Sequence, residues 1–222
     1  MTAFETFFNK CKIPLKLCIF GNKPLKMNFL AHIYLSEENE LIAIGNFMAD
    51  GIRGHQYLDF PEEIQKGVLL HRTIDTFTDA HPIYRQSKHR LHEKYGHYSG
   101  VIMDIVYDHF LAKNWANYHP VPLNTYAENF YQSLRNHYAL LTEKTKKMLP
   151  YMIARDWLTS YASLAGLEMI LFQMDYRTQH RAHMQEAIVE IQQFYSEFEN
   201  EFTLFFEELR AASQKRLLEL NG

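Results

Sequence analysis

Histidines and aspartates recur at helical spacing in the first half of the chain, and these residue types can do chemistry together. Nine of the twelve histidines lie within the first 119 residues. In the segment 61–79, His71, Asp75 and Asp79 follow one another in steps of four, so a helix places them on one face. Imidazole and carboxylate groups bind divalent metal ions, and both can transfer protons. The pattern predicts a metal-assisted or acid–base site.

These polar residues continue apolar stripes, which indicates that they point into the protein. Ile64 precedes His71 by two turns on the same helical face. In the segment 100–116, Asp104 and Asp108 interrupt an apolar stripe in the same way. Burying unpaired carboxylates is costly, so the interior must supply positive charge to compensate for them.

Two sources of that positive charge remain open. His32, inside an apolar run, and Asp50 add further polar groups that face inward. Arg53 and Arg72 lie close in sequence to Asp50 and His71, so a purely structural network of ion pairs is one source. A divalent cation is the other, and it accounts for the imidazoles as well as the carboxylates. Such mixed oxygen and imidazole sites favour Mn²⁺, Fe²⁺ or Mg²⁺ over metals that select thiolates.

Composition limits the class of protein. The chain carries 23 basic and 26 acidic side chains, a net charge of −3, which is too balanced for a protein that binds nucleic acid by counterion release. No apolar run approaches the ~18 residues of a membrane-spanning helix, so no membrane partner is expected. Cys11 and Cys18 are the only cysteines, which predicts a reducing, cytoplasmic location.

Helical periodicity dominates from Met27 onward, and strand-like alternation is almost absent. Helices are expected near 38–52, 61–79, 83–95, 100–116, 123–148, 151–176 and 181–217, with Pro150 among the breaks between them. The sequence thus predicts a single all-α domain over residues 27–222.

The first 26 residues differ in composition from the rest. They hold five lysines against Glu5 alone, which gives this segment a local charge of +4. The short apolar stretch within it lacks the features of an export signal. Residues 1–26 are therefore expected to form a poorly ordered N-terminal extension, and Met27 is a possible alternative start.

Four motifs in the chain resemble those of the acyl carrier protein phosphodiesterases. They are MNFLAH at 27–32, GNFMAD at 45–50 followed by Arg53 and Gly54, HRTID at 71–75, and DIVYDHFLAKNW at 104–115. The resemblance covers about residues 27–215. It implies a bacterial cytoplasmic hydrolase that removes 4′-phosphopantetheine from holo-acyl carrier protein and leaves the apo carrier. It also implies a helical bundle distantly related to the HD-domain metal phosphohydrolases.

The resemblance also points to the site residues, although the chain lacks the His-Asp dipeptide of the ordinary HD signature. The metal ligands expected from it and from the helical spacing are His32, Asp50, His71, Asp108 and His109, with His32 either a ligand or a partner of one. The expected ion is Mn²⁺, with Mg²⁺ or Fe²⁺ as alternatives.

The remaining polar residues are expected to assist hydrolysis. A metal ion offsets the charge of the phosphodiester and lowers the pKa of a bound water towards ~7. Asp75 or Asp104 is expected to accept the proton of that water or to orient an imidazole. Arg72 or Arg53 is expected to hold a phosphate oxygen.

Acyl carrier proteins are acidic, so the resemblance also implies a basic docking face. The first choice is the cluster Arg85, Lys88, His89, Arg90 and Lys94, and the second is Lys144, Lys146 and Lys147. An ordinary solvated helix face is an equally good interpretation of either cluster. Two other functions stay open: a metal phosphohydrolase acting on a nucleotide or another small phosphoester, and a non-catalytic helical binding protein.

Overall fold

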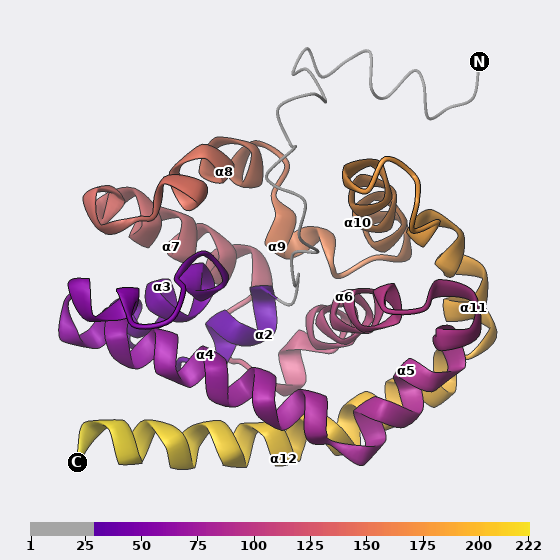
Figure 1. The fold of residues 1–222 in the computed structure, drawn as a ribbon, viewed down its shortest axis with the longest axis horizontal. Coiled ribbons are helices and arrows are strands. Elements are labelled where there is room, and N and C mark those ends of the chain that lie inside the picture. Colours follow the sequence, from indigo (N-terminus) through magenta and orange to yellow (C-terminus); the bar gives the residue numbers. More distant parts are fainter. Residues whose placement is uncertain (1–28) are drawn as a thin grey trace.

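The computed structural model describes residues 29–222, and helices account for nearly all of this range (Figure 1). No strand occurs between Phe29 and Gly222, so the predicted all-α class is confirmed. The helices are α2 (Phe29–Tyr34), α3 (Glu40–Met48), α4 (Glu62–Ala80), α5 (Pro82–Tyr95), α6 (Tyr98–Lys113), α7 (Leu123–Asn136), α8 (Glu143–Ala154), α9 (Trp157–Ser160), α10 (Leu164–Arg177), α11 (Ile188–Gln193) and α12 (Tyr195–Asn221). Short 3-10 helices join them: η2 (Ala49–Gly51), η3 (Gln56–Asp59), η4 (Trp115–Asn117), η5 (Tyr138–Leu140) and η6 (Met184–Ala187).

Helices α2 and α6 form the centre of the molecule. Helix α12 runs along one edge beside α4 and α5, α7 and α8 cover one side, and α10 covers the other (Figure 1). Helix α6 is buried on almost every face, including the aspartates Asp104 and Asp108. The expectation that both carboxylates lie inside the protein is confirmed.

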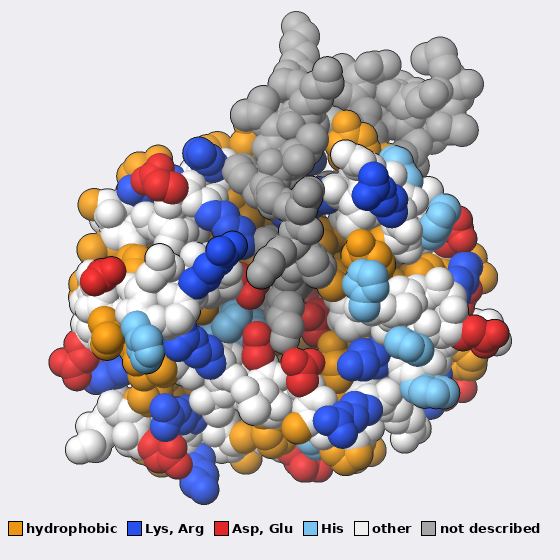
Figure 2. All heavy atoms as spheres, in the orientation of Figure 1, with side chains coloured by type: hydrophobic (Ala, Val, Ile, Leu, Met, Phe, Trp, Pro, Cys, Tyr) orange, Lys and Arg blue, Asp and Glu red, His pale blue; other side chains and the backbone are white. Residues whose placement is uncertain are grey.

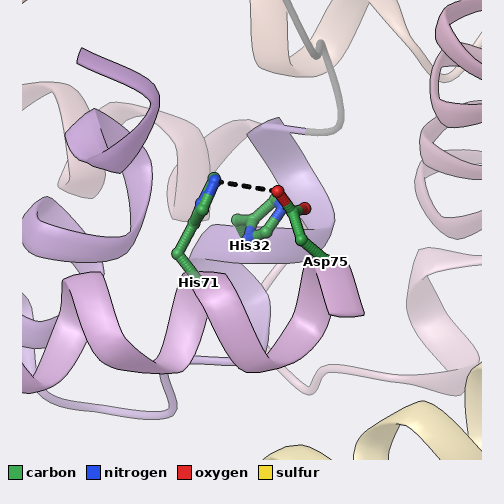
Figure 3. Close-up of side chains that lie close together, drawn as sticks. All are labelled: His32, His71 and Asp75. Atoms are coloured by element: carbon green, nitrogen blue, oxygen red, sulfur yellow. Dashed lines mark ion pairs between the residues drawn. The ribbon is translucent and has the colours of Figure 1, made fainter. Parts of the chain in front are cut away.

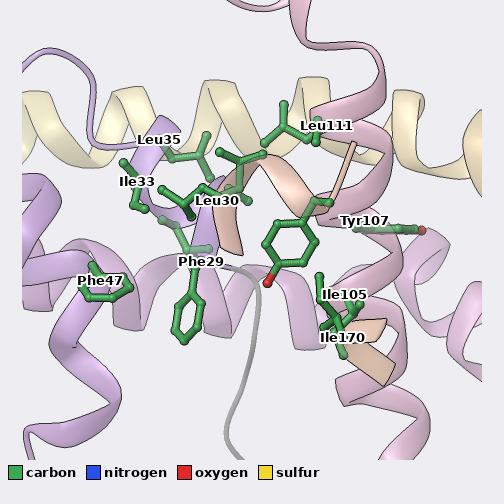
Figure 4. Packing of buried hydrophobic residues seen from close by; sticks show 14 of the residues in the cluster. Phe29, Leu30, Ile33, Leu35, Phe47, Ile105, Tyr107, Leu111 and Ile170 are labelled. Atoms are coloured by element: carbon green, nitrogen blue, oxygen red, sulfur yellow. The ribbon is translucent and has the colours of Figure 1, made fainter. Parts of the chain in front are cut away.

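The main core packs around α2. Phe29, Leu30 and Ile33 of this short helix belong to one buried cluster with apolar side chains of α6 and α10 (Figure 4), and α2 packs against α3 and α6. A six-residue helix is not stable alone in water, so this burial holds α2 in place. The core thereby fixes the position of His32, which belongs to the same helix.

Two glycines allow α3 and α4 to cross in close contact. A Cβ atom on Gly45 would lie 2.3 Å from the carbonyl oxygen of Ile64, and one on Gly67 would lie 2.2 Å from that of Ile42. No side chain fits at such distances, so the crossing requires glycine at both positions. His71 follows Gly67 by one turn, and the close crossing brings it towards the end of α3.

Several predicted helices are shorter than expected. The segment 123–148 is divided between α7 and α8 by the 3-10 helix η5. Pro150 lies inside α8 rather than between helices, which corrects the predicted break. Proline has no backbone N–H, so one carbonyl group of the preceding turn loses its intrahelical donor. Pro150 is exposed, so water can hydrogen-bond to that carbonyl group instead.

Left-handed residues cause the other breaks. Asp156 has φ +44° just before α9, and Gln179, His180 and His183 have positive φ between α10 and η6. Asp156 divides the predicted segment 151–176, and the other three residues separate η6 from α10. Asparagine, aspartate and histidine tolerate this conformation better than most residues, but spacing alone does not reveal it.

The predicted extension, residues 1–26, lies outside the described residues, and so does Met27. Among the helices over residues 29–222, none combines the length and the apolar character that crossing a bilayer requires.

Candidate metal centre

Three side chains from two helices meet at the surface of the core. His32 comes from α2, and His71 and Asp75 come from successive turns of α4 (Figure 3). The two imidazole rings stack with their centroids 4.2 Å apart. Asp75 Oδ1 lies 3.6 Å from His32 Nε2, and Asp75 Oδ2 lies 3.4 Å from His71 Nε2. Both histidines are buried, whereas the Asp75 side chain is 23% exposed, so the cluster opens to solvent through its carboxylate.

The separations within the cluster suit a shared metal ion. They exceed the ~2.7–3.2 Å of a hydrogen bond that involves nitrogen, and His32 Nε2 is buried without a hydrogen-bond partner. Two ligand atoms that each lie about 2.1 Å from one ion are about 3.4 Å apart in tetrahedral geometry. An orphaned imidazole nitrogen facing a carboxylate at this distance is the arrangement that a divalent cation would complete.

Asn46 of α3 fixes the orientation of His32. The Asn46 amide group donates to the carbonyl oxygen of His32 at 2.8 Å and to Ser36 Oγ at 2.9 Å. Its oxygen therefore faces His32 Nδ1, which donates to it at 2.6 Å. The proton on Nδ1 leaves the lone pair of Nε2 directed at the cluster, as a metal-binding histidine requires. Asn46 was not among the predicted site residues.

Asp50 joins the cluster through His71. Its Oδ1 atom lies 3.5 Å from His71 Nε2, and its side chain is 25% exposed. Asp50 belongs to the 3-10 helix that follows α3, so the close α3–α4 crossing brings it to α4. The structure thus brings together four of the predicted site residues, namely His32, Asp50, His71 and Asp75.

The charges within the cluster are coupled. Burial lowers the pKa of His71, but the carboxylates of Asp50 and Asp75 outweigh it and raise this pKa to about 9. Burial alone would raise the pKa of Asp75, but the two histidines hold it well below its usual range. Burial and the neighbouring His71 lower the pKa of His32. In the absence of metal, His71 therefore carries the proton and His32 stays neutral near pH 7.

Asp108 does not join this cluster. Its two carboxylate oxygens accept hydrogen bonds from the backbone amides of Leu30 and Ala31, each at 2.9 Å, in the first turn of α2. The side chain is fully buried, and burial raises its pKa well above the ordinary value although the two amides oppose this rise. In the structure Asp108 supports the helix that carries His32, and it is not among the side chains that meet at the cluster.

His109 also lies apart from the cluster. Its Nδ1 atom is 2.7 Å from the carbonyl oxygen of Tyr161, and its Nε2 atom is 2.7 Å from the Tyr195 hydroxyl. Both ring nitrogens have protein partners, so neither is directed at a shared site. The structure therefore does not bring His109 to His32 and His71.

Asp104 is held by a tyrosine. The Tyr84 hydroxyl donates to Asp104 Oδ1 at 2.7 Å and approaches the carbonyl oxygen of Gly100 at 3.1 Å. Asp104 is 5% exposed and lines a cavity between α4, α5 and α6.

Arg72, one of the two arginines expected to hold phosphate, contacts the segment that precedes α4. Arg72 donates to the carbonyl oxygen of Gly54 at 2.6 Å, and its guanidinium lies 4.9 Å from the centre of the Tyr57 ring. Arg53 is exposed. Within residues 29–222 neither arginine forms an ion pair with a carboxylate. A network of ion pairs between these arginines and the buried aspartates is therefore not what neutralises the site.

Other cations approach the cluster from helices distant in sequence. Lys144 of α8 is half-buried, and its pKa is lowered by burial and by Arg177, while Asp50 raises it. Its stem lies 3.6 Å from the position a Cβ atom of Gly51 would take. On the face shown in Figure 2, acidic side chains lie near the centre of the molecule, with lysine and arginine side chains on both sides.

The basic residues of α5 do not form one common surface. Arg90 pairs with Glu201 of α12 at 2.7 Å, and Lys94 pairs with Glu190 at 2.9 Å. Arg85 is exposed and donates through Nε to the carbonyl oxygen of Asp79, and Lys88 lies partly exposed over the ring of Tyr84. Of the expected docking residues, Arg85 and Lys88 face the end of α4 that carries the site.

Fold and site together define an all-helical protein with a His–His–Asp cluster able to hold a divalent ion. The sequence model of the family described as acyl carrier protein phosphodiesterase matches residues 27–209. The chain belongs to this family. The family and the phosphodiesterase class predicted from the four motifs are thereby confirmed.

Curated relatives support the same assignment. The acyl carrier protein phosphodiesterase of Pectobacterium atrosepticum is 30% identical over 81% of this chain and 94% of its own length. Those of Photorhabdus laumondii and Yersinia pestis are 29% and 27% identical and are covered over 91% and 99% of their lengths. No solved structure matches the chain, so kinship with the HD-domain bundle stays a prediction.

Proposed function

We propose that this protein hydrolyses the phosphodiester that joins 4′-phosphopantetheine to the serine of holo-acyl carrier protein. The relatives are named for this carrier, and their length is almost fully covered by this chain. The observation that carries the proposal is the buried, unpartnered His32 Nε2, directed at Asp75 and held there by Asn46.

The proposed metal ligands are His32, His71, Asp75 and Asp50. Two imidazoles and two carboxylates suit Mn²⁺, with Mg²⁺ or Fe²⁺ as alternatives. Such an ion supplies Lewis acidity, which draws negative charge from a phosphodiester and makes water a stronger acid. Asp108 and His109 are left out of this ligand set because their polar atoms already have partners on other elements.

The chain's own residues bind and orient the substrate in this proposal. Lys144, rather than Arg53 or Arg72, supplies positive charge near the carboxylate of Asp50, where the phosphate would lie, and Arg177 lies close enough to Lys144 to lower its pKa. Asp75 and Asp50 are the carboxylates of the cluster that reach solvent, so the attacking water approaches from their side. The acidic carrier docks where Arg85 and Lys88 are accessible beside the end of α4.

Incubation of the purified protein with holo-acyl carrier protein and Mn²⁺ tests this function. Mass spectrometry of the carrier should show loss of the whole 4′-phosphopantetheine group, and His71→Asn should abolish the loss. If the carrier stays intact while a nucleotide or another small phosphoester is cleaved, the alternative phosphohydrolase function replaces this one. If neither is cleaved and no metal binds, the protein is a binding protein.

A cytoplasmic location belongs to the same proposal. Acyl carrier protein is its substrate, and the chain's small cysteine content suits a reducing compartment. Fractionation of cells that express the protein at native level would test this.

A further inference from the structure

A cavity of about 360 Å³ lies between the end of α4, α5 and the first turns of α6. Its lining includes Asp79, Tyr84, Lys88, His92, His97 and Asp104. This volume is within the ~300–1,000 Å³ range of pockets that enclose small organic ligands. The cavity is distinct from the His–His–Asp cluster, and the proposed chemistry does not use it.

The cavity begins one helical turn from the cluster. Asp75 belongs to the cluster and Asp79 lines the cavity, and these residues are four apart on α4. Residues at this spacing share a helical face and lie about 6 Å apart along the axis. The metal centre and the cavity are therefore neighbours along α4, close enough for one extended substrate molecule to occupy both.

The cavity wall is mostly apolar and carries several polar side chains. Lys88, His92 and His97 line one part of it. The buried Tyr84 hydroxyl, fixed by Asp104 and by the carbonyl oxygen of Gly100, forms another part. Such a wall offers hydrogen-bond donors and acceptors to amides and hydroxyls. The carboxylates of Asp79 and Asp104 make it unfavourable for a phosphate group.

A phosphodiester has two branches, and they differ in size and charge. In holo-acyl carrier protein one branch is a folded, acidic protein, which cannot enter a cavity of 360 Å³. The other branch is pantetheine, an uncharged chain with two amides, a hydroxyl and a terminal thiol. Only this second branch matches both the size and the polarity of the cavity.

We propose that the cavity between α4, α5 and α6 binds the pantetheine arm of the substrate while the phosphate lies at the metal centre. The inference rests on the proposed function and adds the subsite that distinguishes holo-acyl carrier protein from other phosphodiesters. Asp104 is a binding residue of this subsite, with its carboxylate fixed by Tyr84.

Gly100 offers a way to fill the cavity. A Cβ atom there would lie 3.8 Å from Lys88 Cδ and 3.8 Å from the Tyr84 hydroxyl, which is ordinary contact. Gly100→Ala should therefore be tolerated and serves as the matched control, whereas Gly100→Leu extends into the cavity. Gly100→Met is a second filling variant at the same position, with an unbranched and more flexible side chain.

Hydrolysis of two substrates tests the inference. The filling variants should raise KM for holo-acyl carrier protein about tenfold, equivalent to about 1.4 kcal/mol of binding. They should leave hydrolysis of bis(4-nitrophenyl) phosphate, which has no arm, within about twofold of wild type. Equal losses on both substrates in both variants, or unchanged KM for the carrier, would overturn the inference.

Binding to the metal-free protein separates this inference from the proposed function. Added pantetheine should shift the backbone amide resonances of Gly96 and Ser99, which line the cavity, in wild type and in Gly100→Ala, but not in Gly100→Leu. If these shifts occur while holo-acyl carrier protein is not hydrolysed, the proposed function fails and the subsite stands. If the carrier is hydrolysed while no shift occurs, the subsite is refuted and the function stands.

Discussion

The Nδ1 atom of His32 lies 2.6 Å from Oδ1 of Asn46, and this contact decides which ring nitrogen of His32 is available to a metal. Asn46 is fully buried, and both hydrogens of its amide are used by the carbonyl oxygen of His32 and by Ser36. The amide therefore cannot turn over without losing two hydrogen bonds. The tautomer of His32 is set by the fold before any ion binds.

Asn46→Ala should lower Mn²⁺ affinity about 10–100-fold, the usual cost of losing such an orienting partner. Ser36→Ala is the matched control, because it removes two neighbouring hydrogen bonds and leaves the His32–Asn46 contact in place. Isothermal titration of each metal-free variant with Mn²⁺ gives both affinities. Equal affinities in the two variants would show that Asn46 only supports the fold.

Asp75 and Asp108 are aspartates on inward-facing stripes, but the structure gives them different tasks. Asp75→Asn should remove Mn²⁺ binding and hydrolysis, because an amide is a poorer ligand than a carboxylate. Asp108→Asn should retain both and lower the stability by about 0.5–2 kcal/mol, the usual cost of a lost helix cap. Thermal melts with EDTA and with Mn²⁺ measure the two effects. Metal-dependent stabilisation that persists in Asp75→Asn and disappears in Asp108→Asn would reverse this assignment.

The pH dependence of the metal-free protein should report on His71. Its pKa is about 9 when folded and 6.5 in the reference state, so folding favours the protonated form. The stability that His71 contributes is complete below pH 6.5 and is lost as the pH rises through 9. The melting temperature should therefore fall over this window, and His71→Asn should weaken the fall.

Mn²⁺ affinity should change in the opposite direction over the same pH window. The ion competes with the proton on His71, so affinity should rise with pH up to about 9 and each ion bound at pH 7.5 should release about one proton. Calorimetric titrations in two buffers of different ionisation enthalpy measure that release. An affinity independent of pH would exclude His71 from the ligands.

The helical spacing of residues in the sequence predicted a large part of the metal centre. In α4, the steps from Ile64 through His71 to Asp75 correctly placed an apolar stripe that ends in the polar cluster. The same reasoning placed Asp108 inside the protein, where it lies. Spacing assigns a residue to a helical face but not to a partner, so it could not show that Asp108 meets the amides of α2 rather than an ion.

Features that depend on distant contacts were beyond the sequence. Asn46 was part of a recognised motif, but its role is visible only once α3 and α2 are packed together. Lys144 lies 94 residues from Asp50 in the chain, and only the tertiary fold brings α8 to the site. No prediction was made from Gly45 and Gly67, and the close crossing that they allow is visible only once α3 and α4 are packed together.

Gly67→Ala tests whether that crossing holds the site together. The added methyl group would lie 2.2 Å from the carbonyl oxygen of Ile42, so the helices must separate, at a cost of about 1–3 kcal/mol. The melting temperature should fall by several degrees, at about 2–4 °C per kcal/mol for a chain of this size. Gly100→Ala, with only ordinary contacts, should hold or raise it. A Gly67→Ala protein as stable as wild type would mean that the crossing can relax.

Lys144→Met tests whether the cation from α8 binds the phosphate. The substitution keeps an unbranched side chain of similar length and removes the charge beside Asp50. If Lys144 holds the phosphodiester, KM for holo-acyl carrier protein should rise about tenfold or more, since losing a hydrogen bond to a charged group costs about 1.5–3 kcal/mol. Mn²⁺ affinity should hold or increase slightly, because a neighbouring positive charge is gone.

Lys147→Met is the control, because Lys147 is an exposed residue of the same helix and its substitution removes one charge from α8 without touching the site. The same rise in KM in both variants would assign the effect to docking of the acidic carrier, and no rise in Lys144→Met would remove this lysine from the site.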